Sequence, residues 1–63
     1  SNSHFEYNET IALIFYKLGK KSKAIKELDT AIEKARKSGG DYSNSLQLQE
    51  IIRADKAIPA SFE

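Results

Sequence analysis

The sequence predicts an all-α fold, in which an antiparallel helical hairpin and a third helix form one small three-helix unit. Apolar residues recur at helical spacing in three separate segments of the chain. Gly19 separates the first segment from the second, and Gly39 and Gly40 separate the second from the third. Only about three residues connect the first two segments, and so short a connection makes two helices antiparallel neighbours.

The first predicted helix covers residues 5–18 and is apolar on more than one side. One stripe at helical spacing consists of Ile11, Ala12, Phe15 and Leu18. A second apolar side consists of Leu13, Ile14 and Tyr16. Because a helix with this pattern needs cover on several faces, we expect it to pack against more than one neighbour.

The second predicted helix begins after an N-cap at Ser22, or a residue or two earlier, and ends at the "SGGD" turn of residues 38–41. Its apolar stripe consists of Ala24, Ile25, Leu28, Ala31, Ile32 and Ala35. Half of the stripe is alanine, and small residues at regular spacing on a helix indicate that another backbone approaches closely there. The opposite face carries lysine and glutamate and is predicted to face solvent.

The third predicted helix runs from Ser43 to about residue 57 and has a weaker pattern. Its apolar side includes Leu48, Ile51 and Ile52. Pro59 disfavours a helical conformation at the residue before it, so an irregular tail is predicted for residues 59–63. The predicted organisation is therefore an N-terminal tail or cloning remnant (1–4), a hairpin (5–38), a capping helix (43–58) and the tail. Whether the third helix packs within its own chain or swaps into another is left open.

The composition excludes several classes of protein. The chain has 63 residues, ten basic and nine acidic side chains, a net charge of +1 and no cysteine. It therefore has no disulfide, and a balanced charge is not typical of a nucleic-acid-binding surface. No apolar run approaches the length of about 18 residues that a membrane span needs. We expect a cytoplasmic chain without cofactor or metal, and without a nucleic-acid or membrane partner.

Residues 5–38 resemble a tetratricopeptide repeat, a helix-turn-helix unit of 34 residues. The residues that match its signature are Ile11-Ala12 at the large–small pair, Phe15 at the first aromatic position, Gly19 at the turn, and Ala24 and Ala31 at the small positions. The departures are Asn8 at a position that is usually bulky, Leu28 at a usually aromatic position, and Arg36 in place of the closing proline.

The resemblance implies a non-catalytic module for protein–protein interaction or scaffolding, and a fragment of a larger repeat protein. In this family the first helix of each repeat lines the concave face, so a protein or peptide partner would meet Glu6, Glu9, Leu13, Tyr16 and Lys17. Because about three repeats are needed for stability, the isolated chain is expected to form a homo-oligomer. Its interface would lie near Leu13, Ile14 and Tyr16. The alternative, in which Leu13 and Tyr16 simply pack under the third helix, stays open.

Two other functions compete with this interpretation. The three-helix architecture is also similar to that of the microtubule-interacting and trafficking domain, which binds short helical peptides as a stand-alone monomer. The lysines between Lys20 and Lys26 would suit an acidic lipid or nucleic acid, which predicts steep salt dependence. An enzyme has no support, because His4 has no partner group and Glu6 and Glu9 suit a solvated helix face.

Overall fold

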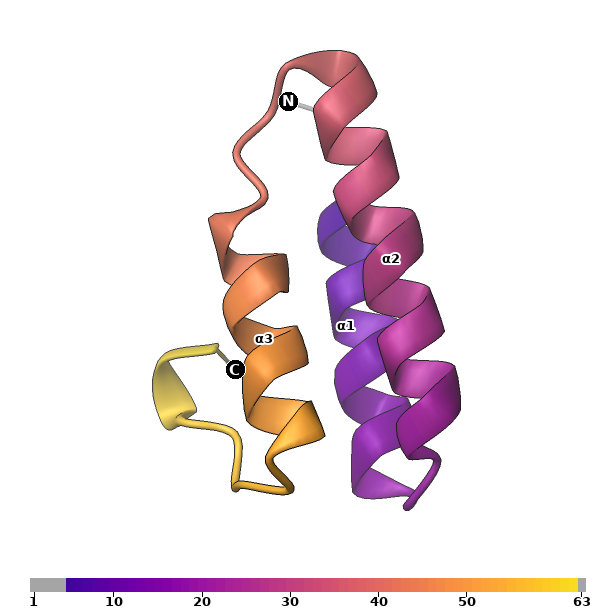
Figure 1. Ribbon diagram of the computed structural model, residues 1–63, viewed down its shortest axis with the longest axis vertical. Coiled ribbons are helices and arrows are strands. Elements are labelled where there is room, and N and C mark those ends of the chain that lie inside the picture. The colour runs from indigo at the N-terminus through magenta and orange to yellow at the C-terminus, as the bar shows by residue number, and fades with distance from the viewer. Residues whose placement is uncertain (1–4, 63) are drawn as a thin grey trace.

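The computed structural model describes residues 5–62 and shows an all-α unit of three helices (Figure 1). Helix α1 spans Phe5–Lys17, α2 spans Lys21–Ser38 and α3 spans Ser43–Arg53, and a short 3-10 turn, η1, spans Ala60–Phe62. The antiparallel α1–α2 hairpin is confirmed, and α3 returns along α2 in the same direction as α1. His4, with the rest of the predicted N-terminal tail, and Glu63 lie outside the described residues.

Glycines end the first two helices, as the sequence predicts. Gly19 has φ 78° and Gly39 has φ 73°, the left-handed conformation of a helix C-terminus. The Lys20 N–H then donates to the Phe15 carbonyl (2.9 Å), and the Gly40 N–H donates to the Ala35 carbonyl (2.7 Å). The tight end of α1 makes Lys20 the N-cap of α2, so α2 begins before Ser22.

Substituting alanine for Gly19 or Gly39 is expected to lower the free energy of unfolding by about 1–2 kcal/mol. No atom lies within 4 Å of a Cβ added at either position, so the cost comes from the backbone conformation alone. Urea unfolding followed by circular dichroism measures the loss. Gly40→Ala is the matched control, because its φ is outside the left-handed range. An equal loss at Gly40 contradicts this explanation.

Helix α3 ends at Arg53, earlier than the predicted end near residue 57. Asp55 adopts the left-handed conformation (φ 58°), which directs the Lys56 N–H to the Ile51 carbonyl (3.1 Å). This is the same hydrogen-bond pattern that ends α1 and α2. Aspartate is one of the few residues besides glycine that tolerate this conformation. The prediction was wrong because no glycine or proline marks the position.

A carboxylate stabilises the start of α3. Oδ1 of Asp41 accepts a hydrogen bond from the Ser43 N–H (2.9 Å). This bond, with a smaller contribution from the Ser43 hydroxyl, lowers the pKa of the Asp41 carboxyl. A lowered pKa means that the charged form is favoured in the fold. The stabilisation is therefore present at neutral pH and is lost as the pH falls through the lowered pKa.

The core draws on all three helices. Leu28 from α2 and Leu48 and Ile52 from α3 are its largest fully buried apolar side chains. Ala12 of α1 and Ala24 of α2 belong to the same cluster and are completely buried. The other two predicted small positions, Ala31 and Ala35, are completely buried as well. The alanines therefore lie where the helices pack, whereas Leu18, predicted for the apolar stripe, is 64% exposed in the turn after α1.

Buried amides connect the helices. The Asn8 amide of α1 donates to Glu27 Oε2 (3.4 Å) and accepts a hydrogen bond from Lys34 Nζ (2.9 Å), both on α2. Gln49 of α3 donates to Asp29 Oδ1 of α2 (2.7 Å). Every buried side-chain nitrogen and oxygen found in residues 5–62 has a partner. Since an unpaired buried polar group is costly, these bonds favour one alignment of the helices.

Candidate functional site

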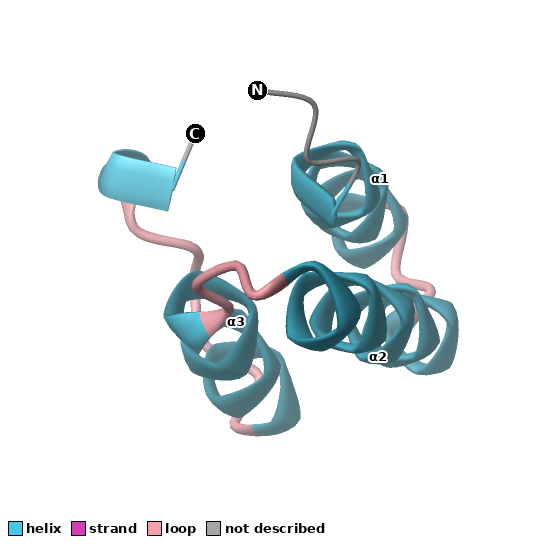
Figure 2. Ribbon diagram, turned by 90° about the horizontal axis from the view of Figure 1, so that it is seen from above, coloured by secondary structure: helices cyan, strands magenta, loops and turns pink. Residues whose placement is uncertain are grey.

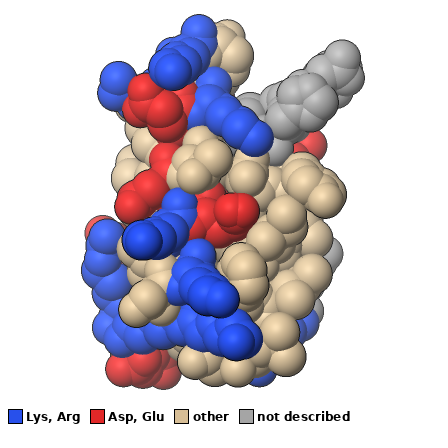
Figure 3. Space-filling view, turned by 90° about the vertical axis from the view of Figure 1, so that its right-hand side faces the viewer, with Lys and Arg blue, Asp and Glu red and all other residues tan. Residues whose placement is uncertain are grey.

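An exposed apolar stripe runs along α1 and into the turn that follows it, on the side away from the core. Tyr7 is 68% exposed, Ile14 53% and Leu18 64%. A spacing of seven places Tyr7 and Ile14 on one side of α1, and the Leu18 N–H still donates to the Ile14 carbonyl (3.1 Å), so the helical geometry extends to Leu18. Figure 3 shows that charged side chains gather over α2, while a largely uncharged area runs along the neighbouring side over α1. We call Tyr7, Ile14 and Leu18 the α1 stripe.

A pocket of about 210 Å³ adjoins this stripe. Four residues at helical spacing on α1 line it together with one residue from η1. They are Thr10, Leu13, Ile14, Lys17 and Phe62. Ile14 therefore belongs both to the α1 stripe and to the pocket. Three of the five lining residues are apolar, and the Thr10 hydroxyl donates a hydrogen bond to the Glu6 carbonyl within α1 (3.2 Å).

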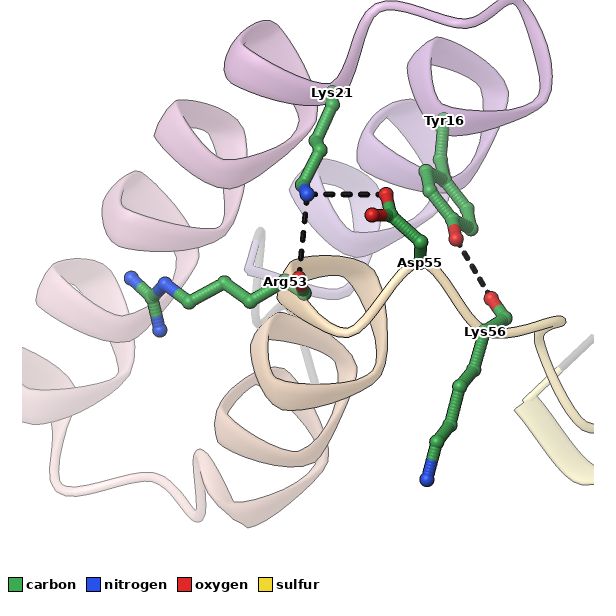
Figure 4. A network of polar contacts seen from close by, with 5 residues as sticks. All are labelled: Tyr16, Lys21, Arg53, Asp55 and Lys56. Carbon is green, nitrogen blue, oxygen red and sulfur yellow. Dashed lines mark hydrogen bonds and ion pairs between the residues drawn. The ribbon is translucent and has the colours of Figure 1, made fainter.

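The C-terminal residues 56–62, called here the returning segment, fold back on the same side of the molecule. Seen from above, the chain leaves α3 and turns towards the side on which α1 lies (Figure 2). Ile58 and Phe62 are half-buried and pack against the core. The Tyr16 hydroxyl of α1 donates a hydrogen bond to the Lys56 carbonyl (2.7 Å; Figure 4). The returning segment thus covers part of the face between α1 and α3.

The structure brings some of the predicted partner-binding residues together and uses others inside the fold. Leu13, Ile14 and Lys17 share the pocket. Glu9 accepts a hydrogen bond from the buried Ser45 hydroxyl of α3, and the Tyr16 hydroxyl is bonded as described above. Glu6 is exposed in the first turn of α1. Glu9 therefore links α1 to α3, and Tyr16 links α1 to the returning segment. A role for either residue in partner binding stays a prediction.

Two pocket residues were not predicted from the sequence. Thr10 precedes Leu13 and Ile14 by three and four residues, so helical spacing alone would place it on their side. Phe62 lies in a segment predicted to be irregular, and nothing local indicates that it folds back. The available signal is Ile58, a second large apolar residue four positions before Phe62.

The lysines between Lys20 and Lys26, which by sequence alone would suit an acidic partner, lie at the turn between α1 and α2 and at the start of α2. Lys21 Nζ contacts Asp55 Oδ1 (3.0 Å) and donates to the Arg53 carbonyl (3.2 Å), so it links α2 to the end of α3 (Figure 4). Lys23 lies over the Phe15 ring, with its Nζ 5.9 Å from the ring centroid. The Lys21–Asp55 pair is exposed, and such pairs contribute little to stability.

Residues 5–62 contain no group of three or more His, Cys, Asp or Glu side chains placed to hold a metal ion. None of the helices in the same range has the length and apolar character needed to cross a membrane. Comparisons with protein-family models, with curated proteins and with solved structures found no match to this chain.

Proposed function

We propose that the chain is a non-catalytic protein-interaction module of the stacked helical-repeat type, and that it docks through the α1 stripe. The observation that carries the proposal is the exposure of Tyr7 and Ile14 on one side of α1 and of Leu18 in the turn directly after it, while Asn8 and Ala12 on the other side of α1 are buried. Large apolar side chains exposed singly need no explanation, but several that lie on one side of the same helix are typical of an interaction surface.

The occupant we propose for the α1 stripe is the same stripe of a second copy of this chain. A spacing of seven and four is the one with which helices pack along each other. The stripe carries no charge, so two copies can meet without burying an unpaired ion. Such a contact is self-complementary and closes as a two-fold dimer. In a longer repeat protein, the helix of a preceding repeat would take the same place.

Two observations support the proposed resemblance to a tetratricopeptide repeat. Two small residues that match the repeat signature, Ala12 and Ala24, lie where helices pack, because both are completely buried within one cluster. Asn8, at the usually bulky position, is also buried and bridges α1 to α2. In this proposal α3 takes the place of the first helix of a following repeat.

Replacing Ile14 with glutamate is expected to dissociate the dimer. A carboxylate at the centre of the stripe would have to be desolvated without a partner in the interface. Sedimentation velocity at several concentrations measures the effect. Leu46→Glu is the matched control, because Leu46 is a similarly exposed apolar residue (47%) on α3, outside the stripe. If Ile14→Glu leaves the mass of the assembly unchanged, or if Leu46→Glu dissociates it equally, the proposed face is wrong.

The second candidate is a stand-alone three-helix domain that binds peptides, and one observation favours it. The pocket lies on the face between α1 and the returning segment, which is where a groove between the first and third helices would run. This candidate expects a monomer at every concentration, so the sedimentation experiment also separates the two functions.

A further inference from the structure

On the side of the molecule where α1 and α3 lie apart, the returning segment covers part of the surface between the two helices. Both helices pack mainly against α2, and the view from above shows η1 on the side left between them (Figure 2). Ile58 and Phe62 are the two apolar side chains that the segment packs against the core there. They are four residues apart, with Pro59 directly after Ile58 and with Phe62 as the last residue of η1.

Side chains dominate the attachment of this segment. Residues 5–62 contain no strand, so no backbone ladder joins the segment to the helices. The Phe62 N–H bonds within the segment, to the Pro59 carbonyl (3.0 Å). The Tyr16 hydroxyl binds the first residue of the segment through the backbone carbonyl of Lys56, a group that every residue type possesses. Another segment with two similar apolar side chains could therefore make the same contacts.

The face also has space beyond what the segment fills. The pocket of about 210 Å³ lies between Phe62 and the α1 residues Thr10, Leu13, Ile14 and Lys17. Phe62 itself is only half-buried. Apolar walls therefore remain open beside the aromatic ring, and a segment with a better fit would bury more apolar surface than the chain's own end does.

We infer that the returning segment is an intramolecular ligand, which competes with a partner segment for the face between α1 and α3. The partner chemistry follows from the side chains now in place: a short protein segment with an aliphatic residue and, four positions later, an aromatic one. This inference goes beyond the proposed function, since it concerns the face that the returning segment covers, which shares only Ile14 with the α1 stripe. The competing segment lowers the apparent affinity for a partner by the fraction of chains in which the face is open.

The test uses a fluorescent peptide with the sequence of residues 56–62 and the full-length chain. Fluorescence anisotropy measures its binding to the wild type and to the double variant Ile58→Ser/Phe62→Ser, whose own segment no longer competes. The double variant is expected to bind the peptide at least about tenfold more tightly than the wild type, which corresponds to a face that is closed in about nine chains of ten. Circular dichroism checks that the double variant keeps its helices.

Three controls keep the result interpretable. Ser61→Ala changes an exposed residue of the same segment and should bind the peptide as the wild type does. A peptide with both apolar residues replaced by serine should not bind. Tyr16→Phe removes only the hydrogen bond to Lys56 and should tighten binding by about two- to tenfold. This variant keeps the ring and so tests the competition without altering either apolar anchor.

The inference is overturned if the double variant does not bind the peptide, or if wild type and double variant bind it equally. Binding of the serine-substituted peptide with the same affinity also overturns it, because the two side chains would then not be recognised. The readout is peptide affinity, whereas the proposed function is read from the mass of the assembly. Failure of one therefore leaves the other standing.

Discussion

Replacing Leu28 with alanine is expected to lower the free energy of unfolding by about 2–5 kcal/mol. Leu28 is completely buried in the cluster to which α1, α2 and α3 all contribute. Truncation removes apolar contacts within that cluster and leaves a cavity that the helices cannot fully close. A core this small supplies little stability beyond that amount. A large fraction of the variant should therefore be unfolded at 25 °C.

Urea unfolding followed by circular dichroism at 222 nm measures this loss. Leu46→Ala is the matched control, because it makes the same change at a leucine that is 47% exposed. The control is expected to change the unfolding free energy by less than about 1 kcal/mol. Equal losses for the two variants would mean that burial of Leu28 is not what holds the helices together.

Replacing Ala24 with leucine is expected to destabilise the fold by about 1–3 kcal/mol or more. Ala24 is completely buried and shares the core cluster with Ala12 of α1. A leucine side chain at this point needs space that the neighbouring helix occupies. The two helices must therefore move apart or the new side chain must adopt a strained rotamer. The opposite outcome, a more stable variant, would mean that the alanines do not mark a close contact.

Lys26→Leu separates overpacking from the other effects of a leucine on this helix. Lys26 is exposed on α2, and lysine and leucine have similar helix propensities. This variant should unfold at nearly the same urea concentration as the wild type. A loss comparable to that of Ala24→Leu would assign the effect to added hydrophobicity and not to the missing space.

The helices could be predicted from the sequence because their signals are local. Apolar residues at helical spacing place all three, and Gly19 and Gly39 mark where two of them end. Alanine within an apolar stripe at helical spacing is also a local signal. For this reason Ala12 and Ala24 were correctly placed in the core. The end of α3 has no such signal, since the left-handed conformation of Asp55 could not be predicted from an aspartate at that position.

The candidate site was predictable only in part, because its contacts join residues far apart in the sequence. The resemblance to a helical repeat placed Leu13 and Lys17 on the partner-binding face and Ile14 at an interface between copies, and all three line the pocket. The return of Phe62 depends on the direction in which the chain leaves α3, which follows from the conformation of Asp55. The hydrogen bonds of Glu9 with Ser45 and of Tyr16 with Lys56 could not be inferred from any local pattern.

The α1 stripe is the centre of this account, and the molar mass of the wild-type chain in solution tests it most directly. Size-exclusion chromatography with light scattering, run over a wide range of loading concentrations, gives that mass. We expect the mass to rise with concentration towards that of two chains, because Tyr7, Ile14 and Leu18 gain cover only in an assembly. A folded chain that keeps the mass of one copy at every concentration would contradict the account.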